Sequence, residues 1–228
     1  MNIQSNTQLI TFNNWTLRIR PATLKTPRLL VLIHGLTGDE NSMWVFVRNF
    51  SEDYWIIAPR ASYDSEHPDG GYSWWPRPSG SPGWQDEYRV TLGLEELRST
   101  AEALISLIDA YAAENDIRAS QFDVIGFSQG GVLANAIALL HPERIRRVGV
   151  LASFIPSGAN AIVQGRPLNN KRFFVAHGRL DGKVKIDYAR QSAELLEKAG
   201  ADVTFCEDEI GHKVSAHCLR ALEDFYSK

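Results

Sequence analysis

The sequence has few cysteines and no long apolar run. Only two residues are cysteine, Cys206 and Cys218, which excludes a framework of several disulfides and is consistent with a reducing compartment. We expect both thiols to pack as small buried hydrophobes. No stretch approaches the roughly 20 apolar residues of a membrane span, and the start of the chain lacks the basic and apolar segments of a signal peptide. These absences predict a cytoplasmic protein without stable membrane insertion.

Charge of one dominant sign is also missing. The formal net charge is -3, the pI is near 6.1, and like charges do not gather in blocks. Nucleic acids and anionic membranes are bound by basic patches, so the composition predicts neither of these partners. A small neutral or mildly anionic molecule is the expected partner, and a homodimer is compatible with the sequence.

Internal repeats, low-complexity tracts and linker-like changes of composition are absent as well. We therefore predict a single domain over residues 1–228. Apolar, β-branched runs alternate with segments of helical periodicity, which indicates an α/β fold with an open, mostly parallel sheet and helices on both faces. Strands are expected at 8–12, 15–20, 28–33, 54–58, 122–126, 147–151, 172–176 and 202–206, and helices at 42–50, 92–113, 129–140, 184–199 and 214–226.

One long segment interrupts this alternation. Residues 61–85 are rich in proline, glycine and tryptophan, a composition typical of a long ordered loop rather than of a helix or strand. Ligands of open parallel sheets bind beyond the carboxyl ends of the strands. We therefore expect the functional residues on the loops at those ends.

The clearest local motif lies at residues 126–130, which read Gly-Phe-Ser-Gln-Gly between a predicted buried strand and an apolar helix. This is the G-x-S-x-G pattern of the nucleophile elbow in α/β-hydrolases, in which a serine occupies a strained turn. Gly126 and Gly130 would give that turn steric clearance, which makes Ser128 the candidate nucleophile. The alternative is an ordinary strand-to-helix turn in which Ser128 is only a helix cap.

A serine nucleophile needs a histidine base, and the triad of this fold runs along the chain in the order serine, acid, histidine. His212 lies between the last predicted strand and the last predicted helix, at the carboxyl edge of the sheet. We expect His34 and His177, each before a glycine at a strand end, to hold those turns by hydrogen bonds. The other histidines lie in the long loop, after a helix and within the last helix: His67, His141 and His217.

Asp181 is the candidate acid of the triad. It lies on the loop directly after the penultimate predicted strand, where the acid that orients the histidine is expected. Asp187 falls in the next predicted helix and is expected to be solvated. Three acidic residues close to His212 compete for the role, with a solvated acidic loop as their alternative explanation: Glu207, Asp208 and Glu209.

Acyl transfer places negative charge on a carbonyl oxygen, which two backbone N–H groups stabilise in α/β-hydrolases. We expect the first N–H from Gln129, directly after the candidate nucleophile. The second is expected from Leu36, in a glycine-rich segment that follows the predicted strand at 28–33. A glycine-rich turn without a catalytic part is the alternative, since such turns are common.

Several motifs follow one another along most of the chain. They are Leu32-Ile33-His34-Gly35-Leu36, Pro59-Arg60-Ala61, Gly71-Tyr72-Ser73-Trp74-Trp75, the segment 125–131, His177-Gly178 with Asp181 and Val184, and Gly211-His212. In this order they resemble the phospholipase/carboxylesterase family of α/β-hydrolases, which includes bacterial carboxylesterases and acyl-protein thioesterases. The resemblance implies an α/β-hydrolase fold without a separate cap domain. It also implies the triad and oxyanion donors already selected: Ser128, Asp181, His212, Leu36 and Gln129.

Two positions depart from the family pattern. An aspartate often follows the aromatic pair and a proline often follows the valine, whereas this chain has Pro76 and Lys185 there. The segment 76–85 also differs from the family pattern. These differences concern the substrate rather than the chemistry.

Candidate substrate-binding residues are aromatic or aliphatic and would form an apolar wall beside the nucleophile: Trp74, Trp75, Phe154 and Ile155, with Trp84 as a further candidate. Such a wall favours short or medium acyl chains. The alternative is that these side chains only pack the long loop onto the body of the protein. We expect no metal and no cofactor, because no group of histidines, cysteines or carboxylates has ligand spacing.

The sequence therefore predicts a serine hydrolase that cleaves carboxylic esters of short to medium acyl chains through an acyl-enzyme intermediate. An acyl-protein thioesterase or a lysophospholipase would use the same triad. A dienelactone-type hydrolase shares the fold but normally uses a cysteine nucleophile, which Ser128 contradicts. A ligand-binding receptor on a degenerate hydrolase fold would be expected to have a broken triad.

Overall fold

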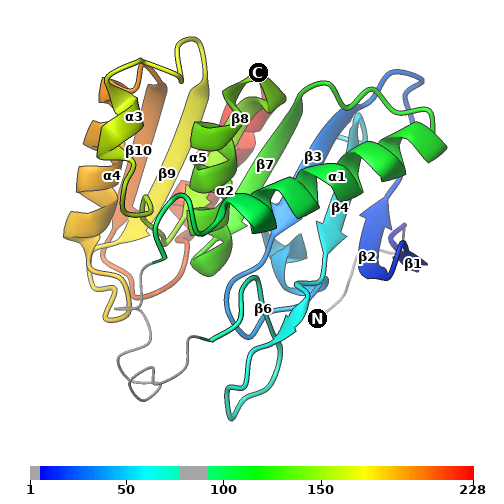
Figure 1. Ribbon diagram of the computed structural model, residues 1–228, viewed down its shortest axis with the longest axis horizontal. Coiled ribbons are helices and arrows are strands. Elements are labelled where there is room, and N and C mark those ends of the chain that lie inside the picture. Colours follow the sequence, from blue (N-terminus) through cyan, green and yellow to red (C-terminus); the bar gives the residue numbers. More distant parts are fainter. Residues whose placement is uncertain (1–5, 78–91) are drawn as a thin grey trace.

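A computed structural model of the protein describes residues 6–77 and 92–228. These residues form an eight-stranded sheet (Figure 1) with the strand order β1-β2-β4-β3-β7-β8-β9-β10. β2 pairs antiparallel with both β1 and β4, and all other neighbours in the sheet are parallel. The strands are β1 Gln8–Phe12, β2 Trp15–Arg20, β3 Arg28–Ile33, β4 Tyr54–Pro59, β7 Phe122–Phe127, β8 Ile145–Leu151, β9 Arg172–Gly178 and β10 Asp202–Asp208.

Every strand predicted from the sequence is confirmed. β3 shows why apolar runs form strands here: all but its first residue are buried, and successive residues face alternate hydrophobic cores. A strand covered on both faces needs no polar alternation. β9 and β10 extend past their predicted ends because they remain paired with each other up to Gly178 and Asp208.

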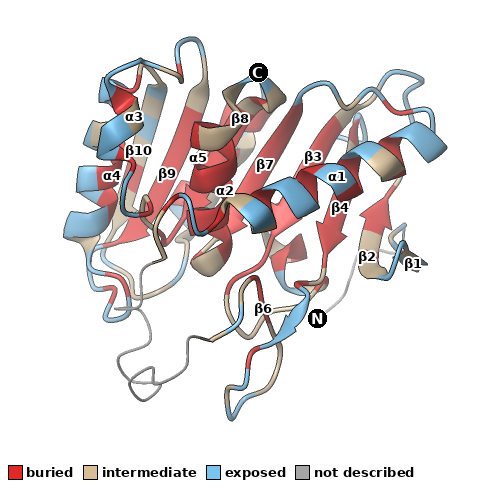
Figure 2. Ribbon diagram, in the orientation of Figure 1, coloured by how far each residue is buried: buried red, intermediate tan, exposed pale blue. Residues whose placement is uncertain are grey.

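Helices cover both faces of the sheet, and its central strands β3, β4, β7, β8 and β9 are almost entirely buried, whereas the edge strands β1 and β10 are partly exposed (Figure 2). α1, α2 and α4 pack over one hydrophobic core, while α5 packs over the other. None of the helices among the described residues is both long and apolar enough to cross a membrane. The α-helices are α1 Arg98–Glu114, α2 Gln129–Leu140, α3 Asn160–Val163, α4 Ile186–Lys198 and α5 Ala216–Ser227.

Two predicted helices differ from expectation by more than two residues at one end. The segment 42–50 contains only a 3-10 helix, Ser42–Phe46, followed by turns in which the N–H groups of Val47 and Phe50 donate to the carbonyls three residues before them. The helix predicted from residue 92 begins at Arg98. Its first residues are diverted because the Leu94 N–H donates to the Ser157 carbonyl, on the loop that follows β8.

The predicted loop at 61–85 contains a short hairpin of β5 Tyr63–Asp64 and β6 Tyr72–Ser73. Strands of two residues leave no periodicity in a sequence, so pattern analysis does not detect them. The part of the predicted loop from residue 78 onward, including Trp84, lies outside the described residues.

The two cysteines are a correction to the sequence analysis. Both are buried, as expected, but they are not free thiols: Cys206 at the end of β10 and Cys218 in α5 form a disulfide. The chain leaves β10, turns through a short loop and returns beside the strand as α5, which brings together two residues 12 positions apart. The count of two cysteines does not by itself show that the chain brings them together.

Candidate active site

The predicted triad residues lie on loops at the carboxyl ends of three parallel strands. Ser128 follows β7, Asp181 follows β9 and His212 follows β10. Because β7, β8, β9 and β10 are parallel neighbours, their carboxyl ends lie along one edge of the sheet. The fold thereby joins Ser128 to His212, which is 84 positions away in the sequence.

The three side chains form a continuous hydrogen-bonded series. His212 Nε2 lies 3.0 Å from Ser128 Oγ, and His212 Nδ1 lies 2.7 Å from Asp181 Oδ2. The Asp181 side chain is completely buried, whereas the His212 side chain keeps 13% of its exposure. With its proton on Nδ1, a neutral His212 donates to Asp181 and accepts from the Ser128 hydroxyl. This arrangement can remove the proton from a serine hydroxyl as the oxygen attacks a carbonyl carbon.

The turn that carries Ser128 depends on two glycines. Ser128 has φ 51° and ψ -118°, a conformation rarely adopted by a residue with a side chain. A β-carbon at Gly126 would lie 2.1 Å from the Gly130 carbonyl oxygen, and one at Gly130 would lie 2.1 Å from the Ile33 carbonyl oxygen. The steric clearance predicted at both positions is therefore confirmed.

Asp181 is held as a carboxylate by its surroundings. Its Oδ1 accepts from the backbone N–H groups of Lys183 at 2.8 Å and Val184 at 2.9 Å. Its Oδ2 contacts His212 and, at 3.3 Å, His177 Nε2. Burial by itself would raise the pKa of Asp181, but the hydrogen bonds from the two histidines and Val184 outweigh it and hold the pKa well below its usual range.

Family comparison agrees with this geometry. A model of the phospholipase/carboxylesterase family matches residues 15–228. The chain belongs to this family. The family therefore places it among the hydrolases of the carboxylesterase and acyl-protein thioesterase type, on the α/β-hydrolase fold that the sequence motifs implied.

Individual family members and solved structures are similar over most of the chain. Acyl-protein thioesterase 1 of Debaryomyces hansenii is 28% identical, over 75% of this chain and 77% of the relative. A probable carboxylesterase of Oryza sativa subsp. japonica is 27% identical, over 90% of this chain and 78% of the relative. The crystal structure of a carboxylesterase from Mesorhizobium loti has a TM-score of 0.78 and 18% identity, covering 98% and 99% of the two chains. This last likeness shows the fold alone.

The segment with the predicted oxyanion donor Leu36 lies beside the nucleophile. A β-carbon at Gly35 would lie 3.3 Å from Ser128 Cβ. The segment is fixed from the other side by β6, since the Thr37 N–H donates to the Tyr72 carbonyl at 3.1 Å. Gly71 allows this approach, because a β-carbon there would lie 2.0 Å from the Thr37 carbonyl oxygen.

The predicted oxyanion donor Gln129 is the first residue of α2, where a backbone N–H has no acceptor within its own helix. Its side chain has a separate role that the sequence analysis missed. Gln129 Oε1 accepts from the Trp74 N–H at 3.1 Å, and Nε2 donates to Ser73 Oγ at 2.9 Å. The residue after the nucleophile thus ties the end of β6 to the start of α2.

The predicted roles of His34 and His177 in holding turns are confirmed. His34 Nδ1 lies 2.7 Å from the Gly35 carbonyl oxygen, and His34 Nε2 accepts from the Ala61 N–H at 3.0 Å. Burial lowers the pKa of His34, which favours the neutral tautomer that this pairing requires. His177 Nε2 lies 2.8 Å from the Val184 carbonyl oxygen and so closes the loop that carries Asp181.

A further buried group was not found from the sequence. Glu40 is 2% exposed and accepts two hydrogen bonds from Arg60, at 2.7 and 2.9 Å. The Arg60 guanidinium also lies 4.7 Å from the centre of the Tyr72 ring. The Glu40–Arg60 pair therefore links the segment after β3 to the hairpin. In the sequence, the only indication of this pair was the presence of Arg60 in one of the family motifs.

Two of the three acidic competitors of Asp181 have other partners. Glu207 binds Arg179 and Arg190, and Asp208 binds Ser215 and His217. These two carboxylates therefore form ion pairs and hydrogen bonds, whereas the alternative considered from the sequence was a solvated acidic loop. Asp187, in α4, lies within 3.7 Å of Arg190 and keeps 74% of its exposure.

The residues of the predicted apolar wall differ in how deeply they are buried. Trp74 is only 1% exposed, packs in the core and donates its indole N–H to the His34 carbonyl at 2.8 Å. It therefore packs the loop onto the body, the alternative considered from the sequence, instead of lining an open surface. Trp75, Phe154 and Ile155 are partly buried against the same core. They remain candidates for a substrate wall.

Gly130→Ala is expected to disrupt the turn that carries Ser128. The new methyl group would overlap the Ile33 carbonyl, so β3 and α2 must move apart, with a loss of unfolding free energy of at least about 1–3 kcal/mol. Chemical denaturation measures the loss, and Gly182→Ala is the matched control because a β-carbon at Gly182 meets nothing within 4 Å. Equal stability of the two variants would contradict the close contact.

Asp181→Asn is expected to destabilise the protein in a pH-dependent manner. The pKa of Asp181 is lowered in the folded state, so its charged form stabilises the fold above the unfolded pKa of about 3.9. This stabilisation is lost as the pH falls from there through the folded pKa. The unfolding free energies of wild type and variant should therefore differ most near neutral pH and converge in acid. A pH-independent difference would count against the electrostatic account.

Proposed function

We propose that the protein is a serine carboxylesterase in which Ser128 is the nucleophile, His212 the general base and Asp181 the orienting acid. The observation that carries the proposal is the pair of contacts at His212, 3.0 Å to Ser128 Oγ and 2.7 Å to Asp181 Oδ2. Family membership supports the reaction class, and the geometry supports these particular residues.

In the proposed first half-reaction, Ser128 Oγ attacks the ester carbonyl carbon while its proton passes to His212 Nε2. The carbonyl oxygen becomes an oxyanion, which the backbone N–H groups of Leu36 and Gln129 stabilise by about 2.7–4 kcal/mol for each donor. The carbon–oxygen bond to the alcohol then breaks, and His212 gives its proton to the leaving alkoxide. The acyl group remains on Ser128 as an ester.

In the second half-reaction, water replaces the alcohol. His212 takes a proton from the water as the water oxygen attacks the acyl carbon, and it returns that proton to Ser128 Oγ as the carboxylic acid leaves. Asp181 stays ionised throughout, since its pKa lies well below its usual range. Its negative charge stabilises the imidazolium form of His212 in each half-reaction.

The proposed substrates are small-molecule esters with short to medium acyl chains. Trp75, Phe154 and Ile155 supply partly buried apolar surface that would contact the acyl group. An acyl-protein thioesterase is the second candidate, favoured by the similarity to a relative of that name. A lysophospholipase would use the same residues, so chain length and leaving group separate these activities.

Hydrolysis of p-nitrophenyl esters from acetate to palmitate tests the proposal. We expect the highest kcat/KM at short or medium chains, and Ser128→Ala should lower kcat by on the order of 10⁶-fold because the nucleophile is lost. The same assay with thioesters of matched acyl chains measures the leaving-group preference.

Ser128→Ala should fold normally, which circular dichroism checks, so a loss of activity can be assigned to chemistry. Labelling by a fluorophosphonate probe should modify wild-type Ser128 and leave the variant unmodified. Activity retained by Ser128→Ala would exclude this serine as the nucleophile. A long-chain maximum would favour the lysophospholipase or thioesterase, and a folded wild type without turnover or labelling would favour a binding protein.

The activity is expected to fall at acid pH, because the proposed mechanism needs a general base that is free to accept a proton. Asp181 adds no protonation step of its own, because its pKa is held well below its usual range and the carboxylate keeps its charge throughout the assay. The kcat/KM of the preferred ester, measured from about pH 5 to about pH 9, should have one acid limb. A second protonation step in that limb, while the protein stays folded, would contradict the state assigned to Asp181.

A further inference from the structure

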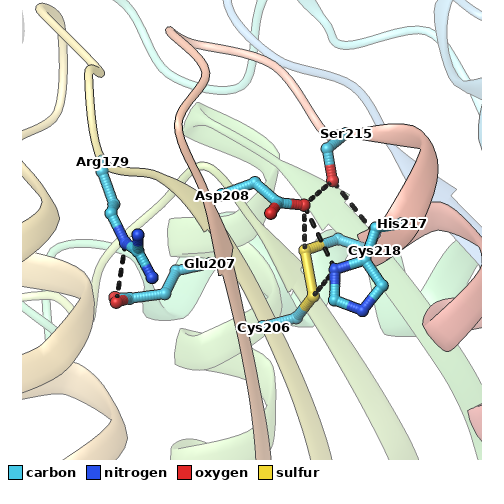
Figure 3. Close-up of a disulfide and its surroundings, with 7 residues drawn as sticks. All are labelled: Arg179, Cys206, Glu207, Asp208, Ser215, His217 and Cys218. Carbon is cyan, nitrogen blue, oxygen red and sulfur yellow. Dashed lines mark hydrogen bonds and ion pairs between the residues drawn. A yellow bond between two sulfur atoms is a disulfide. The ribbon is translucent and has the colours of Figure 1, made fainter.

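Three potential metal ligands, Cys206, His217 and Cys218, lie together at the disulfide, and the carboxylate of Asp208 lies beside them (Figure 3). Cys206 and Asp208 lie near the end of β10, and His217 and Cys218 lie in the first turn of α5. Two thiols, an imidazole and a carboxylate are ligand types that zinc accepts in proteins. The sequence did not suggest this group, because its spacing matches no common zinc motif.

The ligand atoms of Cys206, His217 and Cys218 all lie within 4.8 Å of one another, and Asp208 is close to the last two of these residues. His217 Nδ1 lies 3.9 Å from Cys206 Sγ and 3.2 Å from Asp208 Oδ2, and Cys218 Sγ lies 3.8 Å from Asp208 Oδ2. A tetrahedral zinc ion with ordinary bond lengths separates sulfur from nitrogen or oxygen by about 3.6 Å, and nitrogen from oxygen by about 3.3 Å. The two sulfur atoms are covalently bonded, whereas a tetrahedral zinc ion would hold them about 3.8 Å apart. The disulfide must therefore open, and the sulfur atoms must separate, before an ion can bind.

The carboxylate in the cluster is already oriented. Ser215 donates its hydroxyl to Asp208 Oδ2 and also accepts from the Cys218 N–H at 3.0 Å, as the cap of α5. Carboxylates that bind metals are commonly held by a second hydrogen bond of this kind. The neighbouring carboxylate of Glu207 points away from the cluster and binds Arg179 instead (Figure 3).

The cluster is accessible from solvent. His217 keeps 67% of its side-chain exposure and Asp208 keeps 36%, while the sulfur-bearing residues are buried beneath them. An ion would therefore have a polar, exposed entry and a less exposed pair of thiolates. Exposed nitrogen and oxygen ligands above two less exposed thiolates are suitable for a four-coordinate structural zinc site.

We propose that, after reduction of the Cys206–Cys218 disulfide, this cluster binds a thiophilic divalent cation such as Zn²⁺ through Cys206, Asp208, His217 and Cys218. A dithiol supplies two electrons and two protons, so the protein disulfide becomes two thiols while the dithiol becomes a disulfide. The cation then displaces one proton from each thiol and binds both thiolates. The disulfide and the metal ion are alternative links between β10 and α5.

Replacement of the disulfide by a cation would affect the segment that carries His212. His212 lies within the segment that the disulfide closes, between Cys206 and Cys218. Reduction alone removes the covalent link across this segment, and the bound cation restores a link between the same two elements. The proposal does not depend on the esterase activity.

Cobalt binding tests the site directly. Wild-type protein is reduced with a dithiol, freed of the reductant under anaerobic conditions and titrated with Co²⁺, a spectroscopic substitute for Zn²⁺. We expect thiolate-to-cobalt charge transfer and the visible bands of tetrahedral cobalt, saturating at one ion per chain and displaced by Zn²⁺. Protein that keeps its disulfide should show neither spectrum.

Single variants assign the ligands. His217→Ala and Asp208→Asn change exposed side chains and should weaken Co²⁺ binding to the reduced protein by on the order of tenfold or more. Glu207→Gln is the matched control, a neighbouring carboxylate outside the cluster, and should bind like wild type. The double variant Cys206→Ser, Cys218→Ser should lose the charge-transfer band.

Three results would overturn the proposal. The first is the absence of cobalt spectra in reduced, folded wild type. The second is equal binding by the double cysteine variant, which would place the ion elsewhere. The third is wild-type affinity in both His217→Ala and Asp208→Asn, which would show that the cation binds to the two thiolates without the imidazole and the carboxylate.

Discussion

The close contact between α2 and the end of β3 is the constraint on which the candidate site depends. Gly130 lies against the Ile33 carbonyl, and Gly126 lies against Gly130, with no space for a β-carbon at either glycine. This contact fixes the start of α2 directly behind the turn and holds Ser128 in its unusual backbone conformation. The position of α2, the orientation of Ser128 and the location of the Gln129 N–H at the start of the helix therefore follow from one steric requirement.

Hydrogen bonds extend that constraint to the surrounding loops. Gln129 binds the backbone and side chain at the end of β6, and β6 binds the segment that contains Leu36. On the other side, His212 is oriented by Asp181, whose loop is closed by His177. Each functional group is thus positioned by neighbours that belong to different loops, and none depends on a single contact.

The sequence predicted the strands and the candidate site closely, for physical reasons that differ. Apolar runs such as β3 specify buried strands directly, and the turn that carries Ser128 needs glycines at fixed positions. Both features can therefore be recognised in a short stretch of sequence. The disulfide was not predicted, and the core position of Trp74 was only the alternative to the predicted substrate wall. Both depend on segments that come together only after folding, and composition does not show which segments these are.

The disulfide also changes what a break in the chain would do. It joins Cys206 to Cys218 across the loop that carries His212. If one peptide bond in 209–215 were cleaved, α5 would remain covalently attached to β10, and its buried contacts with the sheet would still hold it in place. New chain ends in this loop, as in a circularly permuted protein, would therefore leave the last helix attached to the sheet.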